Sequence, residues 1–206
     1  MNITVLAASG ATGLELTRQA LDRGHVVTAV ARTPSRVSVP DSDRLTRVAA
    51  DVHDPDSLAR VFPEGTTVLS GLGIAKGEPP GVLTAGAKAV VHAGPERIIW
   101  LGAFGTGVSA DAAGPFTRTL VRLLLKSELD DKVTADRTVL AAGGTVFHAG
   151  PLSTGPLSTT RRTLALADAP RHLFPARVSR ATVAAAMLDE AENRAHVGGT
   201  AIPVER

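Results

Sequence analysis

Short runs of apolar, β-branched residues alternate along the chain with longer stretches whose apolar positions recur at helical spacing. Each short run is apolar on both faces, which is typical of a strand buried inside a parallel sheet. The runs predict strands at residues 3–7, 25–31, 44–50, 66–70, 97–101 and 145–149. The stretches between them predict helices at residues 11–23, from 54 onward, at 80–93 and at 116–142, the last broken near residue 127. This alternation indicates a parallel sheet with helices on both faces.

Boundary residues support several of these elements. Gly24 follows the first predicted helix, where glycine commonly ends a helix. Asp54 and Pro55 open the next helix with an N-cap acid and a proline in its first turn.

The fold class that follows is α/β, a doubly wound, Rossmann-like parallel sheet with a small C-terminal elaboration. Residues 1–206 fit a single domain, since a domain has about 150 residues. Residues 1–150 form its core and residues 151–206 the elaboration. In the elaboration, prolines and glycines predict a loop-rich stretch, after which Ser179 caps a helix and residues 200–204 form a last strand.

Composition excludes several classes of function. The chain has no cysteine and no tyrosine, so a thiolate metal site, a cysteine nucleophile and any phenol-based mechanism are excluded. The net charge of +2 and only six Phe and Trp residues do not predict a nucleic-acid partner. No apolar run approaches the ~18 residues of a membrane span, and the chain opens as a strand without a leader. We therefore expect a cytoplasmic monomer or homodimer with a small-molecule substrate, no membrane partner and no metal site.

A glycine-bearing turn lies between the first predicted strand and the first predicted helix. In a doubly wound fold this turn presents the amides of a helix N-terminus to a pyrophosphate. Glycine is needed because a Cβ would block the approach of the phosphate to the backbone, or of the helix to the strand. The predicted dinucleotide-binding residues of the turn are Ser9, Gly10, Ala11, Thr12 and Gly13. The alternative is a turn that needs glycine only for packing.

Further short motifs follow the later elements along nearly the whole chain, at Asp51-Val52, Gly71-Leu72-Gly73, Phe104-Gly105, Gly150-Pro151-Leu152 and Ser179-Arg180-Ala181. Together with the turn, they resemble the atypical short-chain dehydrogenase/reductase group with an NAD(P)H-binding domain. That group includes biliverdin-IXβ and flavin reductase-like proteins and NmrA-like proteins. Its opening pattern is G-x-x-G-x-x-G, and this chain has Ala7 at the first glycine. One methyl group fits there if Ala7 keeps a negative φ.

The charge after the second predicted strand favours NADP(H) over NAD(H). An NAD site has an acid there for the ribose 2′-hydroxyl, whereas an NADP site has arginine. Residues 30–36 include Arg32 and Arg36 but no Asp or Glu. A guanidinium pairs with a 2′-phosphate through charge-assisted hydrogen bonds. The alternative is that both are ordinary exposed loop arginines.

The resemblance implies further cofactor contacts. Asp51 would accept a hydrogen bond from the adenine amino group and Val52 would flank the ring; alternatively, Asp51 is only a turn residue. Gly71, Leu72 and Gly73 would let the chain pass close beneath the ribose or the nicotinamide; alternatively, they form a flexible loop.

The substrate side is expected where the fifth and sixth predicted strands end. Relatives commonly carry hydroxyl residues at the tip of the fifth strand, but here only the backbone amides of Gly102 and Ala103 remain as donors. Phe104 is positioned to stack on a planar substrate, or alternatively packs in the core. Pro151 and Leu152 are expected to line the same site.

Two residues are candidates for catalysis. Lys132 lies in the helix where related proteins often have a lysine near the cofactor, although ion pairs with Glu128 and Asp136 on the helix surface explain it equally well. His148, at the end of the sixth predicted strand, is expected beside the nicotinamide, where an imidazole can donate a proton near neutral pH. The alternative for His148 is a histidine hydrogen-bonded within the structure.

These features favour an NADPH-dependent oxidoreductase that transfers a hydride to a small planar or carbonyl acceptor of the flavin, quinone or tetrapyrrole type. Residues 1–150 would bind the cofactor and residues 151–206 would shape the substrate side. The alternative is a non-catalytic NAD(P)-sensing regulatory protein of the NmrA-like type, which the missing tyrosine and hydroxyls favour. A nucleotide-sugar epimerase or dehydratase fits less well, because it needs a proton-relay tyrosine and usually a longer substrate domain.

Overall fold

A computed structural model of the chain describes residues 1–75, 77–78, 80–125, 128–169 and 176–205. Its strands are β1 (Asn2–Leu6), β2 (Val26–Ala31), β3 (Leu45–Ala49), β4 (Thr67–Ser70), β5 (Arg97–Ala103), β6 (Thr145–Ala149), β7 (Leu152–Ser153), β8 (Arg162–Ala165), β9 (Val178–Ser179) and β10 (Thr200–Val204). Its α-helices are α1 (Ala11–Asp22), α2 (Pro55–Val61), α3 (Val82–Ala93), α4 (Gly114–Leu125), α5 (Leu129–Ala141) and α6 (Arg180–Asn193). Short 3₁₀ turns are η1 (Pro34–Arg36), η2 (Gly107–Ser109) and η4 (Leu166–Asp168).

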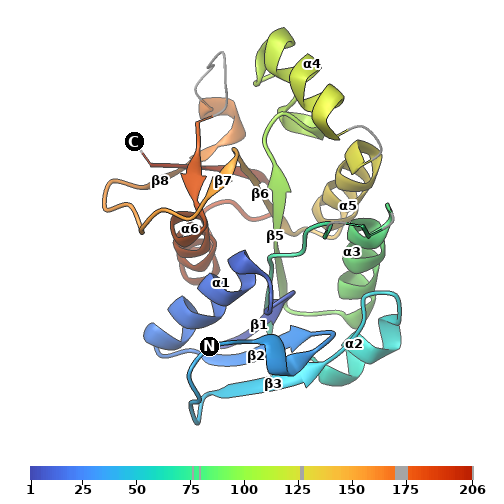
Figure 1. The fold of residues 1–206 in the computed structure, drawn as a ribbon, viewed down its shortest axis with the longest axis vertical. Helices are drawn as coiled ribbons and strands as arrows, with labels where there is room; N and C mark the ends of the chain where they lie inside the picture. Colours follow the sequence, from blue (N-terminus) through green and yellow to red (C-terminus); the bar gives the residue numbers. More distant parts are fainter. Residues whose placement is uncertain (76, 79, 126–127, 170–175, 206) are drawn as a thin grey trace.

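The described strands form one large sheet in the order β3-β2-β1-β4-β5-β6-β10-β8, and a small second pair, β7 and β9 (Figure 1). Neighbouring strands of the large sheet are parallel except β8, which runs antiparallel to β10. The strand order reverses between β1 and β4, as in a doubly wound fold. The predicted α/β, Rossmann-like class is therefore confirmed.

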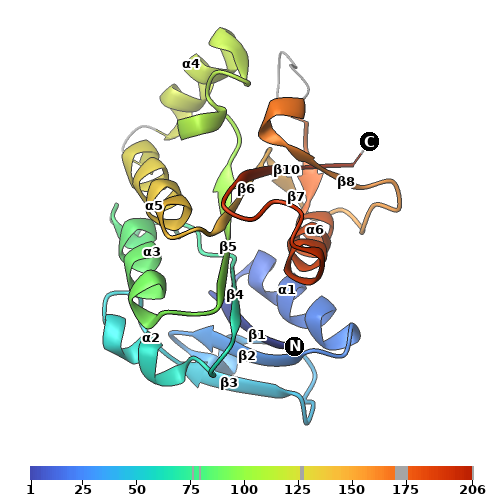
Figure 2. The ribbon, with the colours of Figure 1, turned by 180° about the vertical axis from the view of Figure 1, so that it is seen from behind.

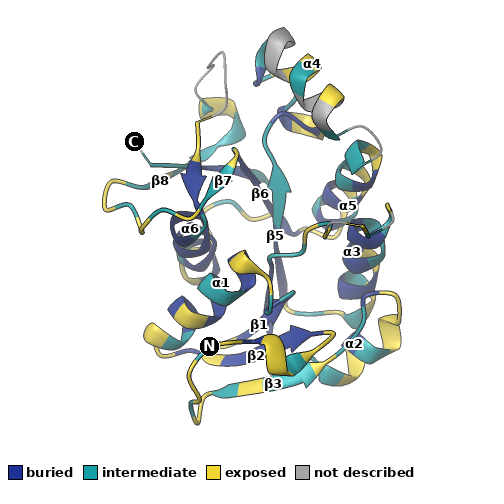
Figure 3. Ribbon diagram, in the orientation of Figure 1, coloured by how far each residue is buried: buried dark blue, intermediate teal, exposed yellow. Residues whose placement is uncertain are grey.

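Helices cover both faces of the sheet. Helices α1 and α6 lie on one face, and α2, α3 and α5 lie on the other, as Figures 1 and 2 show from opposite sides. Strands β4 and β6 are buried along their whole length, as Figure 3 shows for β6, which explains why their sequences are largely apolar on both faces.

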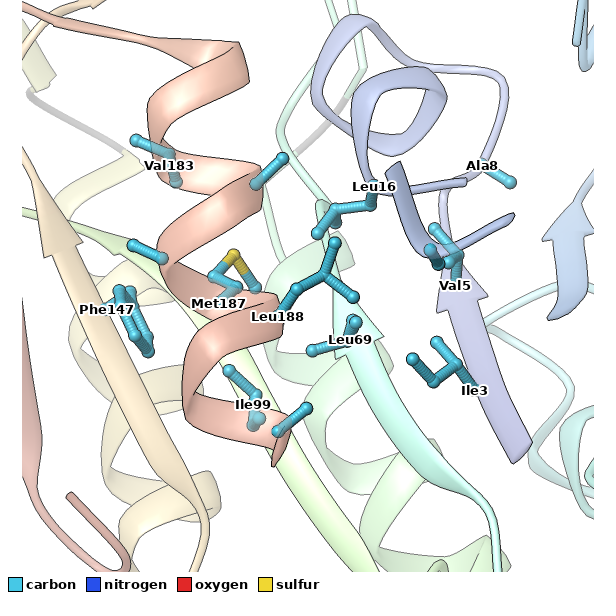
Figure 4. Close-up of a cluster of buried hydrophobic side chains, with 14 of the residues drawn as sticks. Ile3, Val5, Ala8, Leu16, Leu69, Ile99, Phe147, Val183, Met187 and Leu188 are labelled. Carbon is cyan, nitrogen blue, oxygen red and sulfur yellow. The ribbon is translucent and has the colours of Figure 1, made fainter. Parts of the chain in front are cut away.

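Side chains of alternate strand positions enter opposite halves of the core. Val5 points toward α1 and α6, where it joins Leu16, Met187 and Leu188 in the cluster drawn in Figure 4. Leu6, the next residue, joins the cluster beneath α2, α3 and α5. Each fully buried side chain of this size contributes about 1.5–3 kcal/mol through removal from water, so the two clusters hold both helical layers against the sheet.

Three of the residues predicted to begin or end helices are confirmed in that role. The Asp54 carboxylate accepts a hydrogen bond from the Ser57 amide at 3.2 Å, directly before Pro55 opens α2. The Ser179 hydroxyl accepts one from the Thr182 amide at 3.1 Å and so caps α6. Gly24 has a φ of 83° just after the end of α1.

The stretch after residue 150 contains more regular structure than predicted. Strands β7, β8 and β9 lie where a loop-rich stretch was expected, and β8 adds an antiparallel edge to the sheet. These strands have only two to four residues each, too few for a period to show in the sequence. The helical region predicted at residues 116–142 is two helices, α4 and α5. The predicted break near residue 127 lies outside the described residues.

Candidate functional site

A cavity of about 850 Å³ lies at the carboxyl-terminal edge of the sheet. Its lining comes from the segments that follow β1, β2, β3 and β4 and from the ends of β5 and β6. The point where the strand order reverses, between β1 and β4, is part of it. In open α/β sheets this is the crevice in which ligands bind.

Most of the site residues predicted from the sequence line this cavity. They are Ser9, Gly10, Ala11, Thr12, Arg32, Arg36, Asp51, Val52, Gly71, Leu72, Gly73, Gly102, Ala103, Lys132 and Leu152. Four predicted residues are not part of the lining: Gly13, Phe104, His148 and Pro151.

The turn after β1 keeps its shape although its first glycine is replaced by alanine. Ala7 has a φ of 59°, so the expectation of a negative φ is wrong. The turn holds Ala7 in this left-handed region because its carbonyl oxygen accepts a hydrogen bond from the Gly10 amide at 2.9 Å. For a residue other than glycine this conformation costs about 1–2 kcal/mol, so the turn carries local backbone strain.

The first turn of α1 is open toward the cavity. Gly10 is the N-cap and supplies no side-chain hydrogen bond, so the first amides of the helix have no partner within it. Ala11 and Thr12 both line the cavity. Gly71, at the end of β4, passes so close that a Cβ there would lie 3.2 Å from the Gly13 nitrogen. Free amides, a helix N-terminus and glycine on both sides fit a pyrophosphate.

One end of the cavity carries charges of both signs. Arg32 and Arg36 line it from the segment after β2, and Asp51 lines it from the segment after β3. The Asp51 carboxylate accepts a hydrogen bond from the His53 amide at 2.9 Å, so it stabilises its own turn as well as facing the cavity. Glu78, which sequence reasoning missed, reaches across from the β4–α3 connection and pairs with Arg32.

The other end of the cavity carries two cations. Lys132 lines it from α5, and Arg180 lines it from the first residue of α6. Among the described contacts, neither side chain has an ion pair or a hydrogen bond, so the predicted surface ladder with Glu128 and Asp136 is not observed. Arg180 was not predicted to belong to the site, although its place directly after the Ser179 cap was a usable signal.

Asp131, the neighbour of Lys132, fixes α5 against the start of α3. Its carboxylate accepts hydrogen bonds from the amides of Gly81, Leu83 and Thr84 at 2.8–3.1 Å. Burial acts to raise the pKa of Asp131, but the hydrogen bonds from Thr84, Gly81 and Leu83 outweigh it and hold that pKa below its ordinary value.

His148 does not lie beside the cavity, contrary to expectation. The side chain is 0% exposed and both ring nitrogens are engaged, Nδ1 at 2.7 Å from Ser109 Oγ and Nε2 at 3.0 Å from Asp136 Oδ2. Because β6 alternates its side chains between the two faces, His148 points toward α5 and not along the strand toward the cavity. The structure shows the alternative, a histidine hydrogen-bonded within the protein.

Only one of the three residues predicted to contact the substrate lines the cavity. Leu152 lines the cavity, whereas Phe104 and Pro151 do not. Phe104 is half-buried and its amide donates to the Ala149 carbonyl at 2.8 Å, which ties the segment after β5 to the end of β6. Pro151 is exposed.

No group of three or more His, Asp or Glu side chains in the described part of the chain could hold a metal ion. None of the helices described is long and apolar enough to cross a bilayer.

The fold and the open helix N-terminus define a dinucleotide-binding α/β protein. A sequence profile of the NAD(P)H-binding family matches residues 7–194, and the chain belongs to this family. No curated protein matches it in sequence.

Solved structures share the fold over nearly the whole chain. A protein from Burkholderia pseudomallei described as exported is 25% identical, with a TM-score of 0.77 and 99% of each chain covered. The anaerobilin reductase ChuY from Escherichia coli O157:H7 is 17% identical, with a TM-score of 0.77, covering 100% of this chain and 97% of that one. A short-chain dehydrogenase/reductase from Veillonella parvula in complex with NADP is 19% identical, with a TM-score of 0.74 and coverage of 98% and 93%.

Proposed function

We propose that the chain is an NADPH-dependent reductase that transfers a hydride to a small planar or carbonyl acceptor, of the flavin, quinone or tetrapyrrole type. The observation that carries this proposal is one continuous cavity that joins the glycine turn and Arg32 at one end to Lys132 and Gly102 at the other. A dinucleotide laid along it has its pyrophosphate at the start of α1 and its two nucleoside ends at the two charged ends of the cavity.

The residues at the Arg32 end have distinct roles in this proposal. Arg32 and Arg36 bind the 2′-phosphate of NADPH, because guanidinium groups pair with phosphate through several charge-assisted hydrogen bonds. Asp51 retains a second carboxylate oxygen, beyond the one that accepts from His53, and this oxygen accepts from the adenine amino group. Val52 packs against the ring.

The residues at the Lys132 end orient the reacting groups. When bound, NADPH supplies the hydride. Lys132 donates hydrogen bonds to the ribose hydroxyls, and the backbone at Gly102 and Ala103 leaves room for the nicotinamide. Flavin, quinone and tetrapyrrole acceptors need no strong acid from the protein, because water can supply the proton that follows the hydride. The protein contributes proximity and orientation.

The two cations at this end also favour an acceptor with negative charge. Arg180 stands at the first residue of α6 and is uncommitted among the described contacts, so it is available to a phosphate or carboxylate of the acceptor. FMN carries such a group. The similarity of the fold to that of an anaerobilin reductase supports an acceptor of the tetrapyrrole kind. The NADP bound to another relative supports the choice of cofactor.

A second candidate is a cytoplasmic NAD(P)-sensing protein of the NmrA-like type. The observation that favours it is the burial of His148, which leaves the cations Lys132 and Arg180, and no histidine or carboxylate, among the described residues that line the acceptor end. A sensor would bind the dinucleotide and turn over no acceptor.

The deciding experiment is NADPH and NADH consumption at 340 nm against FMN, a quinone and a panel of aldehydes. Binding titrations of both cofactors are carried out on the same sample. Turnover with an acceptor supports the reductase. Tight binding without turnover favours the sensor, and absence of binding by either cofactor contradicts both.

A further inference from the structure

The cation proposed for the 2′-phosphate already has an anionic partner. Arg32 Nη1 donates to Glu78 Oε1 at 2.7 Å, across the mouth of the cavity and between segments that lie 46 residues apart in sequence. Both residues line the cavity. The Arg32 side chain is 63% exposed and the Glu78 side chain only 13%, so the carboxylate is the more fixed member of the pair.

The loop of Glu78 holds its carboxylate in place. The Glu78 amide donates to the Ala75 carbonyl at 3.0 Å, and the Ala75 amide donates back to Glu78 Oε2 at 3.4 Å. This local turn aims Oε1 at Arg32 without help from a ligand. An acid in this place has a direct effect on cofactor choice, because a carboxylate repels a 2′-phosphate and accepts a hydrogen bond from a 2′-hydroxyl.

We propose that Glu78 is a specificity-determining residue that competes with the 2′-phosphate for Arg32. The inference rests on the proposed function, since it assumes that the adenosine end of the dinucleotide lies beside Arg32. Binding of NADPH exchanges one anionic partner of Arg32 for another, and the carboxylate is left near a phosphate that carries up to about two negative charges. NADH requires no such exchange. Arg36, uncommitted among the described contacts, gives the phosphate a first point of attachment.

The test is a comparison of dissociation constants for NADPH and NADH in the wild type, Glu78→Gln and Glu78→Ala. Both variants should raise the preference for NADPH about two- to fivefold, the size expected when one exposed ionic contact is removed. The same variants should strengthen binding of 2′,5′-ADP more than binding of 5′-AMP. Glu64→Gln is the matched control: Glu64 is exposed and precedes β4, at the edge of the sheet opposite the cavity.

The possible results separate the role of Glu78 from the proposed function itself. A raised NADPH preference in both Glu78 variants, with Glu64→Gln like the wild type, supports the inference. An unchanged or lowered preference, in variants that still bind both cofactors, overturns the inference and leaves the proposed function standing. If the wild type binds neither cofactor, the proposed function is wrong and the inference falls with it.

Discussion

A Cβ on Gly13 would lie 2.2 Å from the carbonyl oxygen of Ala7, so α1 can begin this close to β1 only because residue 13 is glycine. The contact explains why Gly13 supports the cavity without lining it. Gly13 allows α1 to pack closely against the end of β1. The strained turn at Ala7, directly before the helix, leaves the first amides of α1 open toward the cavity.

Gly13→Ala is expected to lower the free energy of unfolding by about 3 kcal/mol, because the methyl group meets backbone atoms that cannot move independently. Urea unfolding measures the change. Gly73→Ala is the matched control, since a Cβ there meets no atom within 4 Å, and it should change stability by less than about 0.5 kcal/mol. Equal losses in the two variants would contradict the packing argument.

Ala7→Gly is expected to stabilise the protein by about 0.5–1 kcal/mol. Relief of the left-handed strain gains about 1–2 kcal/mol, and the greater freedom of glycine in the unfolded chain offsets part of it. Ala8→Gly makes the same change at the next residue, which is buried and has no positive φ, and should destabilise the protein. Thermal unfolding of both variants shows whether each substitution raises or lowers stability. A loss of stability in Ala7→Gly would show that the turn is not strained.

Arg180→Ala is expected to raise KM for FMN about ten- to a hundredfold while leaving KM for an uncharged quinone within about twofold, because one charge-assisted contact is worth about 1.5–3 kcal/mol. Steady-state rates with both acceptors, at saturating NADPH, measure the difference. The uncharged acceptor is the control within the same variant. Equal effects on the two acceptors would mean that Arg180 does not bind the acceptor's negative charge.

His148→Phe is expected to lower the free energy of unfolding by about 2–4 kcal/mol, because it removes the partner of the buried Asp136 carboxylate. Asp136 Oδ1 already has no hydrogen-bond partner among the described residues. Turnover per folded molecule should persist, since His148 does not line the cavity. Loss of turnover with unchanged stability would instead assign His148 a part in the chemistry.

Asp131→Asn is expected to cost about 2 kcal/mol of stability at pH 7, because the charged acceptor of three amides at the start of α3 becomes neutral. The pKa of Asp131 is lower in the folded protein than in the unfolded chain, so the stabilisation is complete above the unfolded value of about 3.9. It is lost as the pH falls from there through the folded pKa. The difference between the urea midpoints of wild type and variant should be constant above about pH 5 and shrink as the pH falls below the unfolded pKa. A difference that grows in that range would contradict this account.

The strands and the turn after β1 could be predicted because the signals are local. A buried parallel strand is an apolar run, and a helix cap is a residue type next to that run, so Asp54, Ser179 and the glycine turn were found directly. The short strands after residue 150 gave no such signal. Strand β8 exists because β10 offers an edge to pair with, which is a property of the folded sheet.

The difference between local sequence signals and contacts that form only on folding also explains which site residues could be predicted. Arg32 could be predicted from its place after a strand, whereas Glu78 reaches Arg32 only through the folding of a distant loop. His148 was expected at the cavity because it ends a strand. Which face of that strand it occupies depends on the register of β6, and one residue of register exchanges the two faces.

The surroundings of Gly102, near the end of β5, restrict which single substitutions are tolerated at that position. A Cβ at residue 102 would lie 2.8 Å from His148 Cδ2 and 2.9 Å from Asp136 Oδ1, so serine cannot enter while that pair remains in place. A protein engineer who wanted a hydroxyl donor here would have to replace both His148 and Asp136 by smaller residues first, and then substitute residue 102. The order of these steps matters, because the buried His148–Asp136 pair crowds any side chain introduced at residue 102 on its own.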